Sequence, residues 1–407
     1  MEKYGRGSRF DPGKCVLFMK VCHFITRMIV GGAQENTFLS ARGLVEAGHE
    51  CVLLSGTLEG SEGALLSHLA NPGIRIVKDS RILRDLSPLK DLQALFWLKK
   101  FFEEEKFDVV HTHSSKAGIL GRIAGRMAGV PVVVHTIHGL SFGPYDSFLK
   151  NKLYITAERI AAKYCDRIYS VAQAMIDQCL AEKIGSPDQF QVVYSGMELD
   201  RFLNAQREES LRKELGIDET APVVGAVARL FPRKGYEDFF PAAKKVLEKN
   251  PDVYFLILGD GPMRKEYEEL TERLGIRSHV VFAGLVSPDE ICRYIAQVDL
   301  VAHFSLKEGL PRVAVQALAE GKPVVAYPLD GTPEVVLDGK SGFLVPVGDH
   351  DKAAEKILQI LSDKTLHREM GEYGRNLVKG LFDWPVMSRT LIGEYERLLA
   401  LKDRKEK

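Results

Sequence analysis

Two cations and two polar acceptors are spaced in the second half of the chain in a way that suits one anionic ligand. Arg229 follows the apolar run 223–228, and Lys234 comes five residues later in a short loop. Glu308 opens the sequence Glu-Gly-Leu-Pro, and Gln316 lies eight residues further on. Arg and Lys on one turn can neutralise a departing diphosphate, and acceptors two helical turns apart can contact separate hydroxyls. The pattern predicts a site for a nucleoside diphosphate that carries a sugar.

Both pairs follow predicted strands. The runs 223–228 and 299–303 have the apolar composition of buried strands, and ligands of open α/β sheets bind at the carboxyl ends of strands. Pro311 is expected in the first turn of a helix, where free backbone N–H groups suit an anion or sugar oxygens. Each residue alone could equally be a solvated charge or a partner of the helix dipole. The prediction therefore depends on all of them together.

Strand-like runs alternate with helical stretches in two series. The first comprises 16–21, 51–54, 108–111, 132–135, 167–170 and 191–194, and the second comprises 222–228, 253–258, 279–282, 300–303 and 324–327. This alternation predicts the α/β class, with two Rossmann-like domains that each hold a doubly wound parallel sheet. We expect a flexible N-terminus at 1–14, domains at 15–196 and 222–385, a polar connector at 197–221 with a short helix near 208–215, and a C-terminal helix at 386–407.

Composition excludes several classes. The 55 basic and 55 acidic residues balance, so nothing indicates nucleic acid. Six cysteines lack zinc spacing or a secreted disulfide pattern, which favours a reducing cytoplasm. Lys20 and Arg27 interrupt the first apolar run too early for a signal peptide, and no stretch has 18 uncharged apolar residues. Any membrane contact would be peripheral, on the inner face.

Five motifs in fixed order carry a family resemblance. They are 227–230 with Lys234 and Gly235, the Gly-Asp-Gly-Pro sequence at 259–262, the run 281–284, Glu308 with the three residues after it, and the run 319–325. The series resembles glycosyltransferase family 4 from about residue 15 onward. The resemblance implies the GT-B fold, with two Rossmann-like domains facing a cleft. It also implies sugar transfer with retained anomeric configuration and a C-terminal helix that packs back on the first domain.

The resemblance also assigns roles in the second domain. Arg229 and Lys234 match the family's diphosphate clamp, and Glu308 matches the first acid of its E-x7-E motif. Gln316 stands where the second Glu normally accepts the ribose hydroxyls; its amide oxygen can still accept, but without charge assistance. The remaining matches act through their backbone. Gly309, Leu310 and Pro311 would border the donor sugar, and Gly261 and Leu285 would frame the nucleotide.

In the first domain, Gly31 and Gly32 follow the first strand and open a helix whose N–H groups could meet phosphate or acceptor, although a plain turn also explains them. His138 matches the family's cleft histidine, near the transferred sugar. His111 and His113 resemble its H-x-H strand end, for which we expect one side chain inward and one outward. We expect no bound metal, because the histidines lie on different loops without a carboxylate at ligand spacing, and no other cofactor.

Together these assignments predict a retaining transferase that takes a sugar from a nucleoside diphosphate sugar, for which UDP is the commonest carrier. The predicted acceptor is a saccharide or a lipid-linked molecule in polysaccharide or glycolipid assembly. Two alternatives stay open. One is a non-catalytic or degenerate nucleotide-sugar-binding protein, and the other is a nucleotide-sugar epimerase.

The segment 75–167 suggests where a membrane contact would form. It holds 16 basic against 10 acidic residues, and the stretches 95–102 and 116–126 supply aromatic and basic helical material. Such a mixture can lie on an anionic bilayer. The sequence alone slightly favours the other explanation, a core-facing apolar stripe with solvated lysines.

Overall fold

The computed structural model describes residues 17–57, 71–144 and 146–405, and these form two compact units. The described residues up to Met197 and from Trp384 onward make the first unit, and Glu198–Asp383 make the second. The expected flexible segment 1–14 lies outside the described residues. The stretch expected as a connector, 197–221, falls almost wholly within the second unit, where its short helix runs from Glu209 to Glu214.

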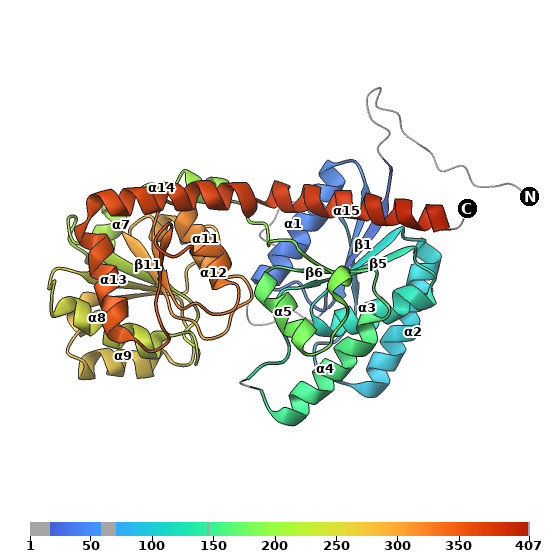
Figure 1. Ribbon diagram of the computed structural model, residues 1–407, viewed down its shortest axis with the longest axis horizontal. Helices are drawn as coiled ribbons and strands as arrows, with labels where there is room; N and C mark the ends of the chain where they lie inside the picture. Colours follow the sequence, from blue (N-terminus) through green and yellow to red (C-terminus); the bar gives the residue numbers. More distant parts are fainter. Residues whose placement is uncertain (1–16, 58–70, 145, 406–407) are drawn as a thin grey trace, which may run out of the picture. The chain divides into compact units, whose positions relative to one another are not determined.

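Seven parallel strands form the sheet in the described part of the first unit (Figure 1). Their order, β3-β2-β1-β4-β5-β6-β7, reverses direction between β1 and β4. The strands are β1 (Lys20–Phe24), β2 (Glu50–Gly56), β3 (Arg75–Asp79), β4 (Val109–His113), β5 (Val132–Ile137), β6 (Arg167–Ser170) and β7 (Phe190–Val192). The helices are α1 (Gly32–Glu46), α2 (Pro88–Glu105), α3 (Ser115–Met127), α4 (Phe148–Ala162), α5 (Gln173–Ala181) and α15 (Trp384–Lys405).

Successive strand residues point to opposite sides of this sheet. Both faces carry apolar side chains, and helices cover both of them. On one face α2 and α3 pack on the sheet through a cluster that includes Phe24, Leu54 and Phe102. On the other face α1 and α15 contribute Leu39 and Leu391 to a second cluster. A sheet buried on both sides is the arrangement that the near-continuous apolar runs predicted.

The second unit repeats the plan with six parallel strands among the described residues, in the order β10-β9-β8-β11-β12-β13. The strands are β8 (Val223–Val227), β9 (Tyr254–Leu258), β10 (Val280–Gly284), β11 (Leu300–His303), β12 (Val324–Ala326) and β13 (Gly342–Leu344). The helices are α6 (Asp200–Leu203), α7 (Glu209–Glu214), α8 (Tyr236–Leu247), α9 (Arg264–Arg273), α10 (Ile291–Ile295), α11 (Arg312–Ala319), α12 (Thr332–Val335), α13 (His350–Ser362) and α14 (Lys364–Leu381). The predicted α/β class with two Rossmann-like sheets is confirmed.

The first strand was misplaced by the sequence analysis, and two strands were missed. We expected the first strand at 16–21, but β1 begins at Lys20, whose backbone N–H donates to Asp108 Oδ2 (2.8 Å). The apolar run placed it too early because His23 interrupts the hydrophobic signal inside the true strand. β3 and β13 escaped notice because β3 is the half-exposed edge of its sheet and β13 has only three residues.

The expectation for His111 and His113 was wrong. Residues two apart on a strand share a face, and both side chains are fully buried, with ring centroids 4.2 Å apart. They lie on the face covered by α1 and α15. His111 Nδ1 is 2.5 Å from the hydroxyl of Tyr395 on α15, and its Nε2 is 2.6 Å from Thr136 Oγ1. The histidine thus ties the C-terminal helix to the centre of the sheet.

We expect Tyr395→Phe to lower the free energy of unfolding of the first unit by about 1–3 kcal/mol, because it leaves a fully buried imidazole nitrogen without a partner. Urea titration followed by tryptophan fluorescence reports on this unit, since both tryptophans, Trp97 and Trp384, belong to it. Tyr164→Phe is the matched control, because Tyr164 is 39% exposed in the same unit. Equal unfolding curves for the two variants would contradict the assignment.

Candidate functional site

One predicted cation, Lys234, and the predicted acid, Glu308, meet at the carboxyl edge of the second sheet. Strand order reverses between β8 and β11, and ligands of doubly wound sheets bind outside the carboxyl ends of strands at such a reversal. Arg229 and Lys234 lie in the loop after β8, and Glu308 lies in the loop after β11. Adjacent parallel strands therefore bring together residues that are more than seventy positions apart in the sequence.

Lys234 and Glu308 form a direct ion pair. Lys234 Nζ is 2.6 Å from Glu308 Oε1 and 3.5 Å from Ser305 Oγ, and the two charged side chains are 26% and 20% exposed. The backbone N–H of Glu308 donates to Asp330 Oδ2 (2.8 Å), which fixes the start of the Glu-Gly-Leu-Pro segment. An ammonium group has three N–H donors, so these two contacts leave one for a ligand.

The carboxyl of Glu308 is held in its ionised form. Burial alone would raise its pKa, but the neighbouring His303 and Lys234 and the hydrogen bonds from Lys234 and Ser305 together lower it. Burial also lowers the pKa of His303, so this imidazole is neutral at pH 7. Lys234 therefore provides the positive charge that stabilises the carboxylate. The result is an ionised Glu308 carboxylate beside the Lys234 cation at the carboxyl edge of the sheet.

The loops after β8, β9 and β11 approach each other through glycines. Gly235 caps α8 at φ 85°, and a Cβ there would lie 2.2 Å from the carbonyl oxygen of Phe304. Gly259 has φ 142°, and a Cβ there would lie 2.1 Å from the carbonyl oxygen of Ala228. At Gly261 a Cβ would lie 2.4 Å from the carbonyl oxygen of Leu230. Glycine is therefore required where these loops pass one another.

We expect Gly235→Ala to lower the free energy of unfolding of the second unit by about 3 kcal/mol or more, because a left-handed φ and a backbone collision both oppose the added methyl group. Gly284→Ala is the matched control. Gly284 has φ 76°, but no atom of the described residues lies within 4 Å of the place that a Cβ would take, so only the backbone cost of about 1–2 kcal/mol remains. Urea titration followed by far-ultraviolet circular dichroism measures both, and similar losses would argue against a crowded loop.

Four of the residues predicted for the donor site lie in the loop after Glu308 or in the helix α11 that follows it. Gly309 and Leu310 continue the loop from Glu308, Pro311 is the N-cap of α11, and Gln316 lies half-buried within that helix. Within the described residues, the Gln316 side-chain amide makes no hydrogen bond. The sequence analysis expected Pro311 in the first turn of this helix and Glu308 two helical turns from Gln316. The helix begins only at Arg312, so Pro311 lies just before its first turn and Glu308 lies in the preceding loop.

The other predicted residues of the second unit lie on the neighbouring loops. Gly261 follows β9, and Leu285 directly follows β10 with its side chain 81% exposed. The guanidinium of Arg229 lies over the ring of Phe231, 5.0 Å from its centroid, and the side chain is exposed. These residues and the ion pair all lie in loops at the carboxyl edge of the same sheet.

In the first unit, Gly31 and Gly32 lie at the start of α1, after β1, where strand order also reverses. His138 follows β5 and is half-buried. Its Nε2 is 2.9 Å from His113 Nδ1, and His113 Nε2 is 2.8 Å from His23 Nδ1. A chain of three imidazoles therefore runs from the buried sheet to His138. The predicted residues of this unit thus also gather at the carboxyl edge of their sheet.

The ligand nitrogens of His23, His111 and His113 lie within 4.8 Å of one another. The sequence analysis placed its histidines on different loops and did not consider His23. His111 and His113 instead lie within one strand, β4, and His23 lies on the adjacent strand β1. Both nitrogens of His111 and of His113 already make hydrogen bonds, while His23 Nε2 has no partner among the described groups. A metal ion would have to displace these bonds, so the cluster fits a hydrogen-bonded core better than a metal centre.

Sequence reasoning missed several residues at both sheets. In the second unit these are His303, Ser305 and Asp330, which hold or surround the ion pair. Their signal was available, because each follows or ends a predicted strand at its carboxyl end. In the first unit, Arg122, His135 and Glu158 line a cavity next to His138. Arg122 and Glu158 lie inside helices, where no local pattern separates them from surface charges.

Comparison with known proteins tests the family that the sequence motifs predicted. Residues 207–377 match the family described as glycosyl transferases group 1, and residues 30–201 match Glycosyltransferase Family 4. The UDP-Gal:alpha-D-GlcNAc-diphosphoundecaprenol alpha-1,3-galactosyltransferase of Escherichia coli is 33% identical over 279 residues, which cover 67% of this chain and 71% of that protein. The putative glycosyltransferase EpsD of Bacillus subtilis is 30% identical over 288 residues, covering 68% and 74%.

Among solved structures, Anabaena HepE in complex with UDP and glucose superposes with a TM-score of 0.77 at 23% identity, covering 93% of this chain and 99% of that one. Two parallel α/β units of this topology define the GT-B class of glycosyltransferases. The chain belongs to glycosyltransferase family 4 and is a glycosyltransferase, which confirms the family that the sequence motifs predicted.

Proposed function

We propose that the chain transfers a sugar from a nucleoside diphosphate sugar, with UDP as the carrier, to a saccharide or lipid-linked acceptor in polysaccharide or glycolipid assembly. The observation that carries the proposal is the Lys234–Glu308 pair at the strand reversal of the second sheet. The names of two similar proteins support the donor, since one uses UDP-Gal and the other was crystallised with UDP and glucose. The former acts on a diphosphoundecaprenol-linked sugar, which supports a lipid-linked acceptor.

In this proposal the second unit binds the donor. Arg229 and the remaining N–H of Lys234 contact the diphosphate, where they stabilise the charge that develops as the sugar leaves. Glu308 accepts hydrogen bonds from sugar hydroxyls, the N-terminus of α11 faces sugar oxygens, and Gln316 contacts the ribose. Gly261 and Leu285 border the nucleotide through their backbone. His138 of the first unit orients the sugar or the acceptor, and no metal ion takes part.

We further propose that transfer retains the anomeric configuration by front-face substitution. The bond from the anomeric carbon to the diphosphate oxygen breaks, and the acceptor oxygen bonds to the same face of that carbon. The acceptor's proton passes to the departing diphosphate. The protein then contributes orientation and charge stabilisation rather than a covalent intermediate. Nuclear magnetic resonance of the product distinguishes this from inversion through the anomeric coupling.

A thermal-shift screen with nucleoside diphosphates and their sugars tests the donor, because a ligand that binds the folded state raises the melting temperature. We expect UDP to raise it and one UDP-sugar to raise it further. No shift with any of them at millimolar concentration would contradict the proposal. Binding followed by release of free UDP without acceptor-dependent product would favour the epimerase alternative, and binding without any turnover would favour a non-catalytic binding protein.

We expect Gln316→Glu to increase the thermal shift that UDP produces, because a carboxylate accepts a stronger hydrogen bond from a ribose hydroxyl than an amide does. The same variant should leave the melting temperature of the ligand-free protein within about 2–4 °C, since Gln316 makes no hydrogen bond in the described structure. The deoxyribose analogue dUDP provides the control, because its 2′-hydroxyl is missing. An equal gain with dUDP would place the effect away from that hydroxyl.

Peripheral contact with an anionic membrane is the remaining part of the proposal. No helix in the described ranges is long and apolar enough to cross a bilayer. The stretch 95–102 is only partly available, because Leu98 and Phe102 are buried. The stretch 116–126 does not supply a free basic face, because Arg122 is buried and Arg126 pairs with Asp166.

Exposed apolar side chains instead gather at the beginning of two helices that both contact α3. On α2 these are Leu89, Leu92 and Phe96, and on α4 they are Phe148, Leu149 and Leu153, each more than half exposed. Lys150 and Lys152 lie among the α4 residues. We expect sedimentation with anionic liposomes at low salt, and loss of it in the double variant Phe148→Ser with Leu149→Ser. If the unsubstituted protein does not sediment with the liposomes, the proposed membrane contact is contradicted.

A further inference from the structure

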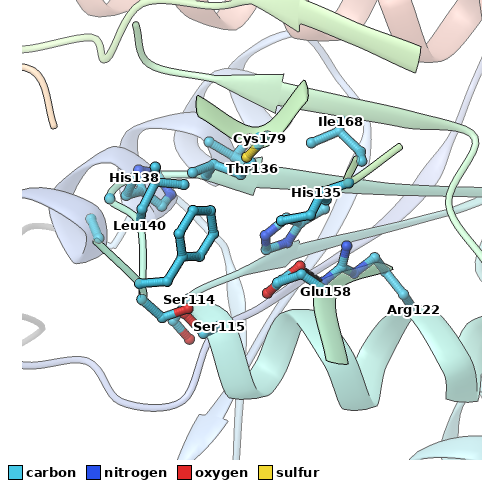
Figure 2. A pocket seen from close by; sticks show the side chains of 16 residues that line it. Ser114, Ser115, Arg122, His135, Thr136, His138, Leu140, Glu158, Ile168 and Cys179 are labelled. Atoms are coloured by element: carbon cyan, nitrogen blue, oxygen red, sulfur yellow. Dashed lines mark hydrogen bonds and ion pairs between the residues drawn. The ribbon is translucent and has the colours of Figure 1, made fainter. Parts of the chain in front are cut away.

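Loops at the carboxyl edge of the second sheet, rather than a deep cavity, form the candidate donor site. In the first unit, α3, α4, α5 and the loop after β5 line a cavity of about 270 Å³ (Figure 2). The void next to Lys234 in the second unit measures only about 10 Å³, which is about the least volume that admits one water molecule. Contacts between neighbouring loops therefore decide where Glu308 and the residues after it lie.

One residue of these loops has a backbone conformation that its side chain disfavours. Asp330 follows β12 and has φ 49°, in the left-handed region. Glycine adopts this region without steric cost, whereas a side chain adds one. Aspartate tolerates the region better than most residues do, but it is still uncommon there. An unfavourable backbone conformation at the edge of a site suggests that the side chain of Asp330 has a function there.

The side chain of Asp330 holds the backbone of Glu308. Its Oδ2 accepts a hydrogen bond from the Glu308 backbone N–H (2.8 Å). The next two residues are joined through the backbone alone, because the N–H of Gly331 donates to the carbonyl oxygen of Gly309 (3.1 Å). The loop after β12 thus bonds to two successive residues of the segment that begins at Glu308. A glycine at position 330 could keep the second bond but has no side chain for the first.

Glu308 is therefore held at both its side chain and its backbone. Lys234, in the loop after β8, places its Nζ 2.6 Å from Glu308 Oε1. Asp330, in the loop after β12, bonds the Glu308 backbone N–H. In the sheet, β11 lies between β8 and β12, so the two contacts come from the two strands that flank β11. A side chain fixed in this way loses little freedom when a ligand binds to it.

We propose that Asp330 is a positioning residue for the donor sugar: through its bond to the Glu308 backbone, it holds Glu308 and Gly309 where the sugar hydroxyls bind. The inference rests on the proposed function, in which Glu308 accepts hydrogen bonds from the sugar of a nucleoside diphosphate sugar. Asp330 acts through Glu308 and does not itself contact the ligand. Other residues are assigned to the diphosphate and the ribose, so Asp330 affects binding of the sugar more than binding of UDP.

The test compares how UDP and its sugars raise the melting temperature of the full chain. The probes are UDP, UDP-glucose, UDP-galactose and UDP-N-acetylglucosamine, and in the unsubstituted protein one UDP-sugar should give a larger shift than UDP does. Asp330→Gly should keep the shift from UDP and lose most of the additional shift from the sugar. Isothermal titration calorimetry should show affinity for that UDP-sugar about tenfold weaker or more, as for loss of a hydrogen bond to a charged group.

The melting temperature of the ligand-free variants separates this role from a purely structural one. Asp330→Gly removes the hydrogen bond and the steric cost of the left-handed φ together, so it should melt within about 2–4 °C of the unsubstituted protein. Asp330→Ala loses the bond but keeps that cost, so it should melt lower than Asp330→Gly and bind the sugar equally weakly. Asp330→Asn tolerates the left-handed region and offers an amide oxygen to the same N–H. It should restore most of the additional shift from the sugar.

Asp338→Gly is the matched control in the same unit. Asp338 Oδ1 also accepts a hydrogen bond from a backbone N–H, that of Leu344 (2.9 Å), but it lies in the turn that precedes β13 and not in the loops of the candidate site. Its loss should leave the affinity for the UDP-sugar normal. A weakened affinity in this variant as well would show that any lost backbone contact of the second unit has the same effect.

The outcomes separate the positioning role from the proposed function. Affinity for the UDP-sugar that is equal in Asp330→Gly and in the unsubstituted protein overturns the positioning role and leaves the transferase proposal intact. Loss of the shifts from UDP and from its sugar in equal proportion also overturns it, and so does weak sugar binding that Asp330→Asn fails to restore. Absence of any shift in the unsubstituted protein contradicts the proposed function and, with it, the role of Asp330.

Discussion

Lys234→Ala should reduce turnover by about 100-fold or more while the chain stays folded. Loss of one group that stabilises developing charge in a preorganised site commonly costs two to three orders of magnitude in rate. Lys234 has the position for this role, since it lies at the strand reversal with Nζ 2.6 Å from Glu308 and one N–H left for the diphosphate. Initial rates with the donor found by thermal shift, read as UDP release, measure the effect.

The same substitution removes the cation beside Glu308, so some loss of stability is expected as well. Glu308 is 20% exposed and remains partly hydrated, which limits that loss. Lys265→Ala is the control, because this lysine is 89% exposed on α9 of the same unit; its rate should stay normal. Arg229→Ala should behave as Lys234→Ala does. Near-normal turnover in both site variants would eliminate the diphosphate clamp.

The second large effect is loss of stability in mild acid. Burial lowers the pKa of His23 to about 3 from an ordinary 6.5, and burial is also the main cause of the lowered pKa values of His111, His113 and His135. In the unfolded chain these imidazoles take up protons below pH 6.5, whereas in the folded first unit they stay neutral. Stability is therefore complete above pH 6.5 and is lost as pH falls below it.

Each such histidine can reduce the free energy of unfolding by at most about 1.4 kcal/mol per pH unit. The four together approach roughly 4 kcal/mol between pH 6.5 and 5.5. Urea titrations at a series of pH values, followed through Trp97 and Trp384, measure this in the first unit. His23→Asn should flatten the dependence, because an amide takes up no proton in this range. A first unit equally stable at both pH values would contradict the neutral, buried state of the cluster.

The fold was largely predictable because its signal is local and repeated. Apolar runs separated by amphipathic stretches predicted two parallel sheets with helices on both faces, and the runs near β8, β9 and β11 were placed within a residue or two. The first strand was misplaced because His23 lies within it. A histidine counts as polar in a sequence pattern, but His23 packs against His111 and His113 on the adjacent strand β4 and is part of a buried cluster.

For the candidate donor site, the sequence predicted which residues lie at the carboxyl edge of the second sheet. Strand ends in a parallel sheet share one edge, so Arg229, Lys234 and Glu308 had to lie at the same edge once β8 and β11 were adjacent. Their individual contacts were not predictable. The sequence suggested separate duties for Lys234 and Glu308, whereas the structure pairs them directly and holds Glu308 through Asp330.

By itself the sequence determined the class: the order of its motifs and its alternating apolar runs define a family 4 glycosyltransferase with two Rossmann-like units. Tertiary structure alone decided which distant side chains share a site. Arg122 and Glu158 are 36 residues apart on two helices and look like surface charges in sequence, yet packing of α3 against α4 buries both. Burial and pairing depend on long-range contacts, which local patterns do not encode.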